Sequence, residues 1–100
     1  MGKYDSIIRS IFSEHYVDGA TSMTFEREEL SAKAQALNIE TPKNLGDIVY
    51  SYKFRKNFPK EIANTAPEGF YWRIRNVGRA HYEFILEEGM EFIEPDTMLA

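Results

Sequence analysis

The sequence lacks cysteine and has no long apolar run, and each absence excludes a class of protein. Without cysteine among its 100 residues, the chain has no disulfide framework, thiolate nucleophile or zinc-thiolate site. No run approaches the roughly 20 apolar residues that a membrane helix needs, and the N-terminus lacks the apolar segment of a secretory signal. We therefore expect a cytoplasmic protein without a membrane partner, stabilised by packing alone.

The content of apolar residues is enough for one core. Hydrophobic residues make up 43% of the chain and aromatic residues 14%, which suits a single small domain and leaves no room for a second. We predict that residues 1–95 form this domain. Residues 96–100 are expected to be a linker, cut before a further C-terminal domain.

Charge is distributed unevenly along the chain. The net charge is -4, which by itself disfavours a nucleic-acid partner. Residues 41–80, however, carry eight Lys and Arg against three Asp and Glu, a net charge of +5, so the remainder carries -9. Such an asymmetry can direct one face of a protein toward phosphate.

Apolar spacing predicts the secondary structure and the fold class. Helical periodicity predicts helices over about 4–15, 26–37 and 43–56, and a short turn follows from Pro59 to Ala63. Alternation predicts strands over 22–25, 71–75 and 81–86, with residues 76–80 as a hairpin loop longer than the tightest turns. This order predicts an α+β fold of the winged helix-turn-helix type: three helices, a short edge strand and a C-terminal β-hairpin wing.

In a winged helix, the third helix can lie in the major groove of double-stranded DNA. Asn44 could contact adenine through both atoms of its amide, and Arg55 could contact guanine or phosphate. Lys43 lies where the helix start would meet phosphate. The residues that we predict to contact DNA from this helix are Lys43, Asn44, Asp47, Ser51 and Arg55.

The hairpin carries a second set of candidate DNA contacts. Arg73 and Arg75 share one strand face, and together with Arg79 and His81 they predict a cationic ridge on phosphate or in the minor groove. An equally good interpretation of Arg73 and Arg75 is that they form the solvent face of the strand, paired with Glu83 across the hairpin. The sequence leaves both interpretations open.

Aromatic residues of the third helix have two interpretations. They could stack on bases, but aromatic residues at helical spacing usually belong to the core, and we expect the core here. The residues concerned are Tyr50, Tyr52, Phe54 and Phe58.

No constellation of residues predicts catalysis. His15 and His81 are far apart and lack the partner residues of a metal or catalytic motif. We expect neither enzymatic activity of this segment nor a metal or cofactor.

Spaced motifs between Phe25 and Pro95 resemble the N-terminal domain of bacterial restriction-endonuclease-like proteins of the PD-(D/E)xK kind. The motifs are TPKNLGDIVY at 41–50, Phe54-Arg55, Phe58-Pro59, APEG at 66–69, Trp72-Arg73-Ile74 and GRAHYEF at 78–84. The resemblance implies that the chain is the DNA-binding half of such an enzyme, with a nuclease domain beyond Ala100 that holds the catalytic carboxylates and lysine. It transfers no catalytic residue to this chain.

Two other functions remain as alternatives. A winged helix can bind a protein instead of nucleic acid, which would suit the overall acidity. A small enzyme is a weaker alternative, because no convergent set of polar residues is present. The sequence gives no indication of the oligomeric state.

Overall fold

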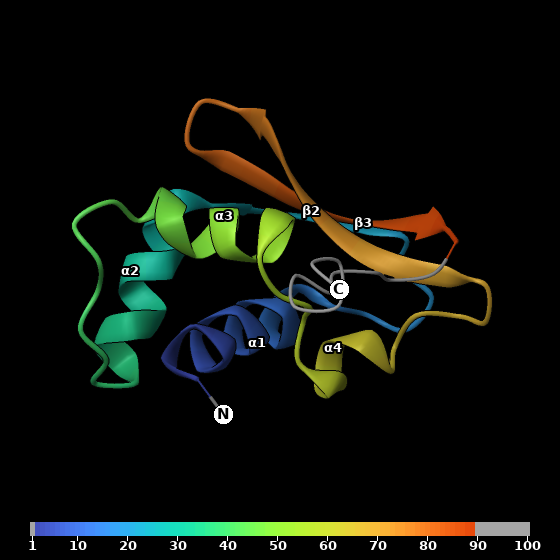
Figure 1. Cartoon of the computed structure of the whole chain (residues 1–100), viewed down its shortest axis with the longest axis horizontal. Helices are drawn as coiled ribbons and strands as arrows, with labels where there is room; N and C mark the ends of the chain where they lie inside the picture. Colours follow the sequence, from blue (N-terminus) through green and yellow to red (C-terminus); the bar gives the residue numbers. More distant parts are fainter. Residues whose placement is uncertain (1, 90–100) are drawn as a thin grey trace, which may run out of the picture.

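Helices cover one side of a three-stranded antiparallel sheet in the computed structural model, which describes residues 2–89 (Figure 1). The helices are α1 (Lys3–His15), α2 (Arg27–Ala36), α3 (Gly46–Phe54) and α4 (Lys60–Ala63). The strands are β1 (Ser22–Glu26), β2 (Phe70–Gly78) and β3 (His81–Glu88), in the order β1-β3-β2. The α+β class is therefore confirmed, while the predicted linker 96–100 lies outside the described residues. None of the described helices is long and apolar enough to cross a membrane.

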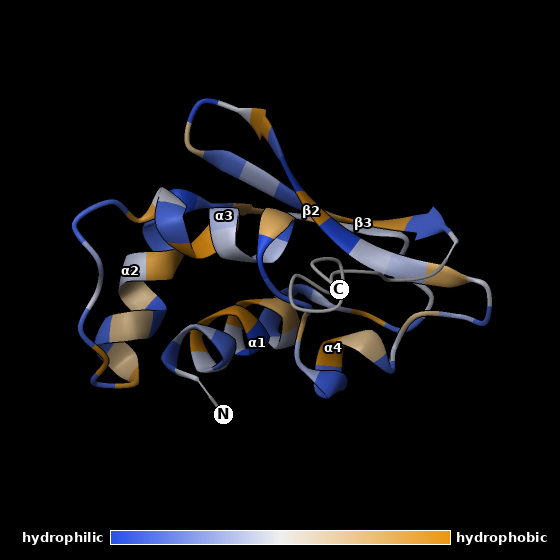
Figure 2. Ribbon diagram, viewed as in Figure 1, coloured by the Kyte–Doolittle hydropathy of each residue, from blue (hydrophilic) through white to orange (hydrophobic). Residues whose placement is uncertain are grey.

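The α1 helix supplies one wall of the core. Its side chains at the predicted helical spacing are buried: Ile7, Ile8, Ile11 and Phe12. Figure 2 shows hydrophobic residues on the side of α1 that faces the sheet. Burying such large apolar side chains is the main source of stability in a domain of this size.

The sheet supplies the opposite wall. Met23 and Phe25 of β1 face the core, and they pair in register with Phe84 and Tyr82 of β3. On β2, Trp72 is buried and its indole N–H donates to the Thr65 hydroxyl at 2.7 Å, which ties the strand to the segment after α4. The prediction of β1 as an edge strand is confirmed by the strand order.

The α3 helix is shorter than predicted. It begins at Gly46, so Lys43 and Asn44 lie in the preceding segment and not on the helix. The cause is the Asn44 side chain, whose carbonyl oxygen accepts the Gly46 N–H at 3.0 Å, because such a local bond competes with helix formation at that residue. At the other end, the N–H groups of Arg55 and Lys56 both donate to the Ser51 carbonyl, which closes the helix.

The hairpin is longer and its turn tighter than predicted. The strands continue to Gly78 and resume at His81, so the turn is Arg79-Ala80 and the predicted loop 76–80 is wrong. The register shifts between Asn76 and Gly78, and this irregularity absorbs one extra residue within the strand. Ala80 takes a positive φ of 59°, a conformation that tight hairpin turns require.

A polar contact ties α1 to α3 at the edge of the core. The Tyr52 hydroxyl donates to the Asp5 carboxylate, and the Lys56 ammonium lies 3.0 Å from the same carboxylate. Partial burial alone would raise the pKa of Asp5, but the hydrogen bonds from Tyr52 and Lys56 and the positive charge of Lys56 outweigh it and hold that pKa below its usual value. Burial, together with the bond to Asp5, raises the pKa of Tyr52.

The lowered pKa of Asp5 predicts a loss of stability in acid. A carboxyl whose pKa is lower in the folded than in the unfolded state stabilises the fold above the unfolded pKa of about 3.9, and this contribution disappears as pH falls through the folded pKa. Asp5→Asn should therefore lower the free energy of unfolding by about 1 kcal/mol at pH 7 and flatten its decline below about pH 5, measured by urea denaturation. Glu68→Gln, at an exposed loop position, controls for the loss of one negative charge. Equal pH dependence in Asp5→Asn and the wild type would contradict the assignment.

Candidate nucleic-acid interface

The cationic side chains fall into two groups according to whether they have a carboxylate partner. Five make ion pairs: Arg9 with Glu61, Lys33 with Glu14, Lys56 with Asp5, Arg73 with Glu87, and Arg75 with Glu83. Seven make none with a carboxylate of residues 2–89: Lys3, Arg27, Lys43, Lys53, Arg55, Lys60 and Arg79. Most of this second group lies on α3, just before it, at the start of α2 or in the hairpin turn.

We call this region the α3–turn surface. It comprises the cations Arg27, Lys43, Lys53, Arg55 and Arg79, together with Asp47, Tyr50, Ser51 and Phe54 on the outer side of α3. Figure 2 shows hydrophilic residues along much of the hairpin turn and along the segment that precedes α3.

Three hydrogen bonds connect the parts of the α3–turn surface. Arg27 donates its backbone N–H to the Ala80 carbonyl at 2.9 Å and its guanidinium to the Asn44 side chain at 3.0 Å. The Lys53 ammonium donates to the Asn76 side chain at 3.3 Å, which connects α3 with β2. The start of α2, the segment before α3, α3 itself and the hairpin turn are therefore coupled.

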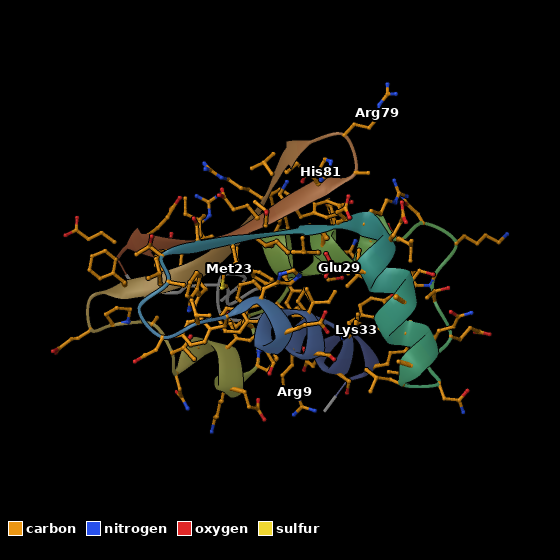
Figure 3. All side chains as sticks on the ribbon, turned by 180° about the vertical axis from the view of Figure 1, so that it is seen from behind. Arg9, Met23, Glu29, Lys33, Arg79 and His81 are labelled. Atoms are coloured by element: carbon orange, nitrogen blue, oxygen red, sulfur yellow. The ribbon has the colours of Figure 1, made fainter. Side chains whose placement is uncertain are left out.

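A hollow separates α3 from the hairpin. It has a volume of about 180 Å³ and is lined by Gly46, Val49, Tyr50, Lys53, Asn76 and Tyr82. Its polar groups come from Lys53, Asn76 and the Tyr50 hydroxyl, and Val49 and Tyr82 are buried beneath it. Arg79 projects from the turn beyond it, as Figure 3 shows from the opposite side of the molecule.

A second hollow lies on the other flank of α3, toward α1. It has a volume of about 430 Å³ and is lined by Tyr4, Asp47, Tyr50, Ser51 and Arg55. The Arg55 guanidinium lies over the Tyr50 ring at 5.4 Å from its centroid, a distance at which a cation is attracted by the ring. The Ser51 hydroxyl donates to the Asp47 carbonyl at 2.9 Å, so its proton is already used within the helix.

The aromatic residues of this region divide between core and surface. Tyr52 and Phe58 are buried, as predicted, and stack at 5.2 Å between ring centroids. Tyr50 is 49% exposed and Phe54 is 60% exposed, so the expectation of the core was wrong for these two. The signal was available in the spacing, because positions 50 and 54 fall on the side of the helix opposite to Ile48.

The position of Asn44 changes its predicted role. Its side-chain oxygen accepts hydrogen bonds from the Gly46 N–H and from the Arg27 guanidinium. A contact to adenine through both amide atoms would require the same oxygen. In the described structure Asn44 therefore orients the start of α3, a role that we had not predicted.

Arg73 and Arg75 point away from α3. They alternate with Trp72 and Ile74, which face the core, and with Asn76, which contacts α3, so they lie on the outer side of the sheet. Arg75 pairs with Glu83 and Arg73 with Glu87, each at 2.7 Å. Arg75 thus pairs with Glu83 across the hairpin, as expected if the two arginines form the solvent face of the strand. A single ridge that joins these two residues to α3 is thus not formed.

The Arg73–Glu87 pair also shifts the protonation equilibria of its members. The hydrogen bond from Arg73 lowers the pKa of Glu87, and the same bond raises the pKa of Arg73. The Tyr71 hydroxyl donates to Glu87 at 3.2 Å. A phosphate at this place would have to compete with a carboxylate for Arg73.

The hairpin end carries the remaining predicted residues. Arg79 and His81 are both exposed, and they lie close together at the end of the hairpin that projects from the domain (Figure 3). His81 opposes Gly78 on β2 and Glu26 on β1. Arg79 therefore lies in the turn at the tip of the hairpin, and His81 begins β3 directly after the turn.

A third hollow, of about 630 Å³, lies on α1 and differs from the other two because its cations are paired with carboxylates. It lies between α2 and α4, and its cations Arg9 and Lys33 are paired with Glu61 and Glu14. These ion pairs neutralise its charge, so it is a weaker candidate for binding an anion. In addition, no three His, Asp or Glu side chains within residues 2–89 are grouped so that they could hold a metal ion.

The α3–turn surface offers several kinds of group that can contact a ligand. It offers unpaired cations for phosphate, exposed rings for apolar contact and one carboxylate, Asp47, for a hydrogen-bond donor. Comparisons with protein-family profiles, with characterised proteins and with solved structures find no match to this chain.

Proposed function

We propose that this domain is a winged helix that binds double-stranded DNA through the α3–turn surface. In this proposal α3 enters the major groove and the β2–β3 turn is the wing on the backbone. The observation that carries it is the concentration of cations without carboxylate partners around α3 and the turn, while cations elsewhere, including those on the outer side of the sheet, are mostly paired.

The dimensions of the domain support the proposal. An α-helix with its side chains is about 10–12 Å in diameter, so α3 fits a major groove that is about 12 Å wide. The hairpin projects past α3 (Figure 1), so the two can contact neighbouring parts of a duplex. The element order α1-β1-α2-α3-β2-β3, with α4 inserted before the hairpin, is the order expected of a winged helix.

The resemblance in sequence extends the proposal to the parent protein. We propose that the domain is the target-binding module of a restriction-type endonuclease, with the nuclease domain following in the same chain. The catalytic chemistry would then belong to that second domain. A winged helix that binds a protein partner is the alternative, and the exposed rings of Tyr50 and Phe54 are the observation in its favour.

Removing cations from the α3–turn surface should weaken duplex binding and reduce its dependence on salt. Each lost phosphate contact lowers the slope of log affinity against log salt by about 0.9. We expect the double variant Lys43→Ala/Arg79→Ala to bind a duplex more weakly and to show a shallower dependence of its affinity on salt. The measurement is fluorescence anisotropy with a labelled duplex at several salt concentrations. Lys60→Ala on α4 and Arg73→Ala on the outer side of the sheet are matched controls that should bind like the wild type. No duplex binding at low salt would contradict the proposal and favour a protein partner.

Replacing Asn44 should affect stability in a way that depends on its side-chain oxygen. Asn44→Ala removes the acceptor of the Gly46 N–H and should lower the free energy of unfolding by about 1 kcal/mol. Asn44→Asp keeps an acceptor and places a negative charge at a helix start and beside Arg27. It should therefore leave the free energy of unfolding nearly unchanged. Urea denaturation of both variants is the measurement. Equal stability of the two variants would show that the bond from the Gly46 N–H to the Asn44 side chain does not stabilise the start of α3.

A further inference from the structure

The outer side of α3 has few groups that can identify a base pair. Its residues Asp47, Tyr50, Ser51 and Phe54 supply two rings and two oxygen groups. The Ser51 hydroxyl proton is donated to the Asp47 carbonyl. The base edges of a duplex are distinguished mainly by Arg, Lys, Asn and Gln in bidentate contacts, and no residue of these types lies on this side of the helix.

The same side offers an unusual amount of ring surface. Tyr50 and Phe54 are one helical turn apart, their centroids are separated by 4.9 Å, and about half of each residue's surface is exposed. Most other aromatic rings of residues 2–89 pack into the core. Tyr50 lines both hollows that flank α3, and the Phe54 ring lies against it one turn further along the helix.

Cations flank this pair of rings. The Lys53 ammonium lies 5.4 Å from the Phe54 centroid on the side toward the hairpin, and the Arg55 guanidinium lies over Tyr50 on the side toward α1. Neither cation is paired with a carboxylate among the described residues. A strand crossing α3 could therefore place a base against the rings and its neighbouring phosphates against Lys53 and Arg55.

We propose that Tyr50 and Phe54 form a stacking site for unpaired nucleobases, so that the preferred ligand is DNA in which a duplex ends in a single-stranded segment. This inference rests on the proposed function and narrows its substrate class. Aromatic side chains bind the faces of bases without regard to sequence, and flanking cations hold the backbone. A fully paired duplex hides its base faces, so in the major groove the rings would meet only base edges and backbone and would gain nothing from stacking.

The test compares three labelled ligands with the same duplex part in equilibrium titrations of the 100-residue chain. One ligand is blunt, the second has a five-nucleotide overhang, and the third has an overhang of five abasic sugar-phosphate units. The second and third ligands carry the same phosphate charge, so a difference between them measures the contribution of the bases. Stacking of one or two bases predicts at least about fivefold tighter binding of the overhang with bases.

Variants test whether the preference for the overhang with bases comes from the two rings. Tyr50→Leu and Phe54→Leu keep an apolar side chain but remove the ring, and each should abolish most of the preference for the overhang with bases. Phe54→Tyr keeps a ring and should retain the preference. Phe70→Leu is the matched control, because Phe70 is a similarly exposed ring at the start of β2 outside the α3–turn surface. Thermal unfolding of each variant establishes that it is folded.

The outcomes separate this inference from the proposed function. Equal binding of all three ligands by the wild type would overturn the stacking site and leave duplex binding standing. Equal weakening of all three ligands by the leucine variants, with the preference for the overhang with bases retained, would also overturn it, because the rings would then not be the source of that preference. Binding to none of the ligands at low salt would overturn the proposed function, and the stacking site with it.

Discussion

Burial of Phe84 at the centre of the middle strand joins all layers of the domain. Its ring lies 5.2 Å from Phe12 of α1, 5.0 Å from Phe25 of β1 and 5.8 Å from Phe58 in the segment after α3. Truncating a buried Phe costs about 3–5 kcal/mol, a large part of the about 5–15 kcal/mol by which small domains are stable. The segment that ends α3 is thereby held against the sheet, and the position of α3 beside the hairpin depends on it.

This arrangement gives the two sides of the sheet different electrostatics. On the outer side, Arg75 has Glu83 directly opposite, and Arg73 reaches Glu87. On the α3 side, Lys53 has only the neutral Asn76 as its hydrogen-bond partner on the hairpin. An overall acidic protein can thus keep cations available for phosphate in one place, because its carboxylates neutralise the cations elsewhere.

The sequence predicted the parts of the fold that burial alone determines. The periodicity of Ile7 to Phe12 and the alternation around Trp72 located α1 and β2, because apolar side chains must face the core. It could not predict the start of α3, which depends on how the Asn44 side chain competes with the backbone. Nor could it place Arg73 relative to α3, since the side of a sheet on which a helix packs is decided by tertiary contacts.

The most direct test of binding through the α3–turn surface is to map which backbone amides change their chemical shifts when DNA is bound. Two-dimensional ¹H–¹⁵N NMR of the labelled chain, recorded during titration with a duplex, reports the environment of each backbone amide. If DNA binds to the α3–turn surface, we expect shifts in the amides of Arg27, residues 43–55 and residues 77–80, with little change in α4 or in the hollow on α1. Shifts concentrated on α4 and α1, or on the outer side of the sheet around Arg73, would contradict it.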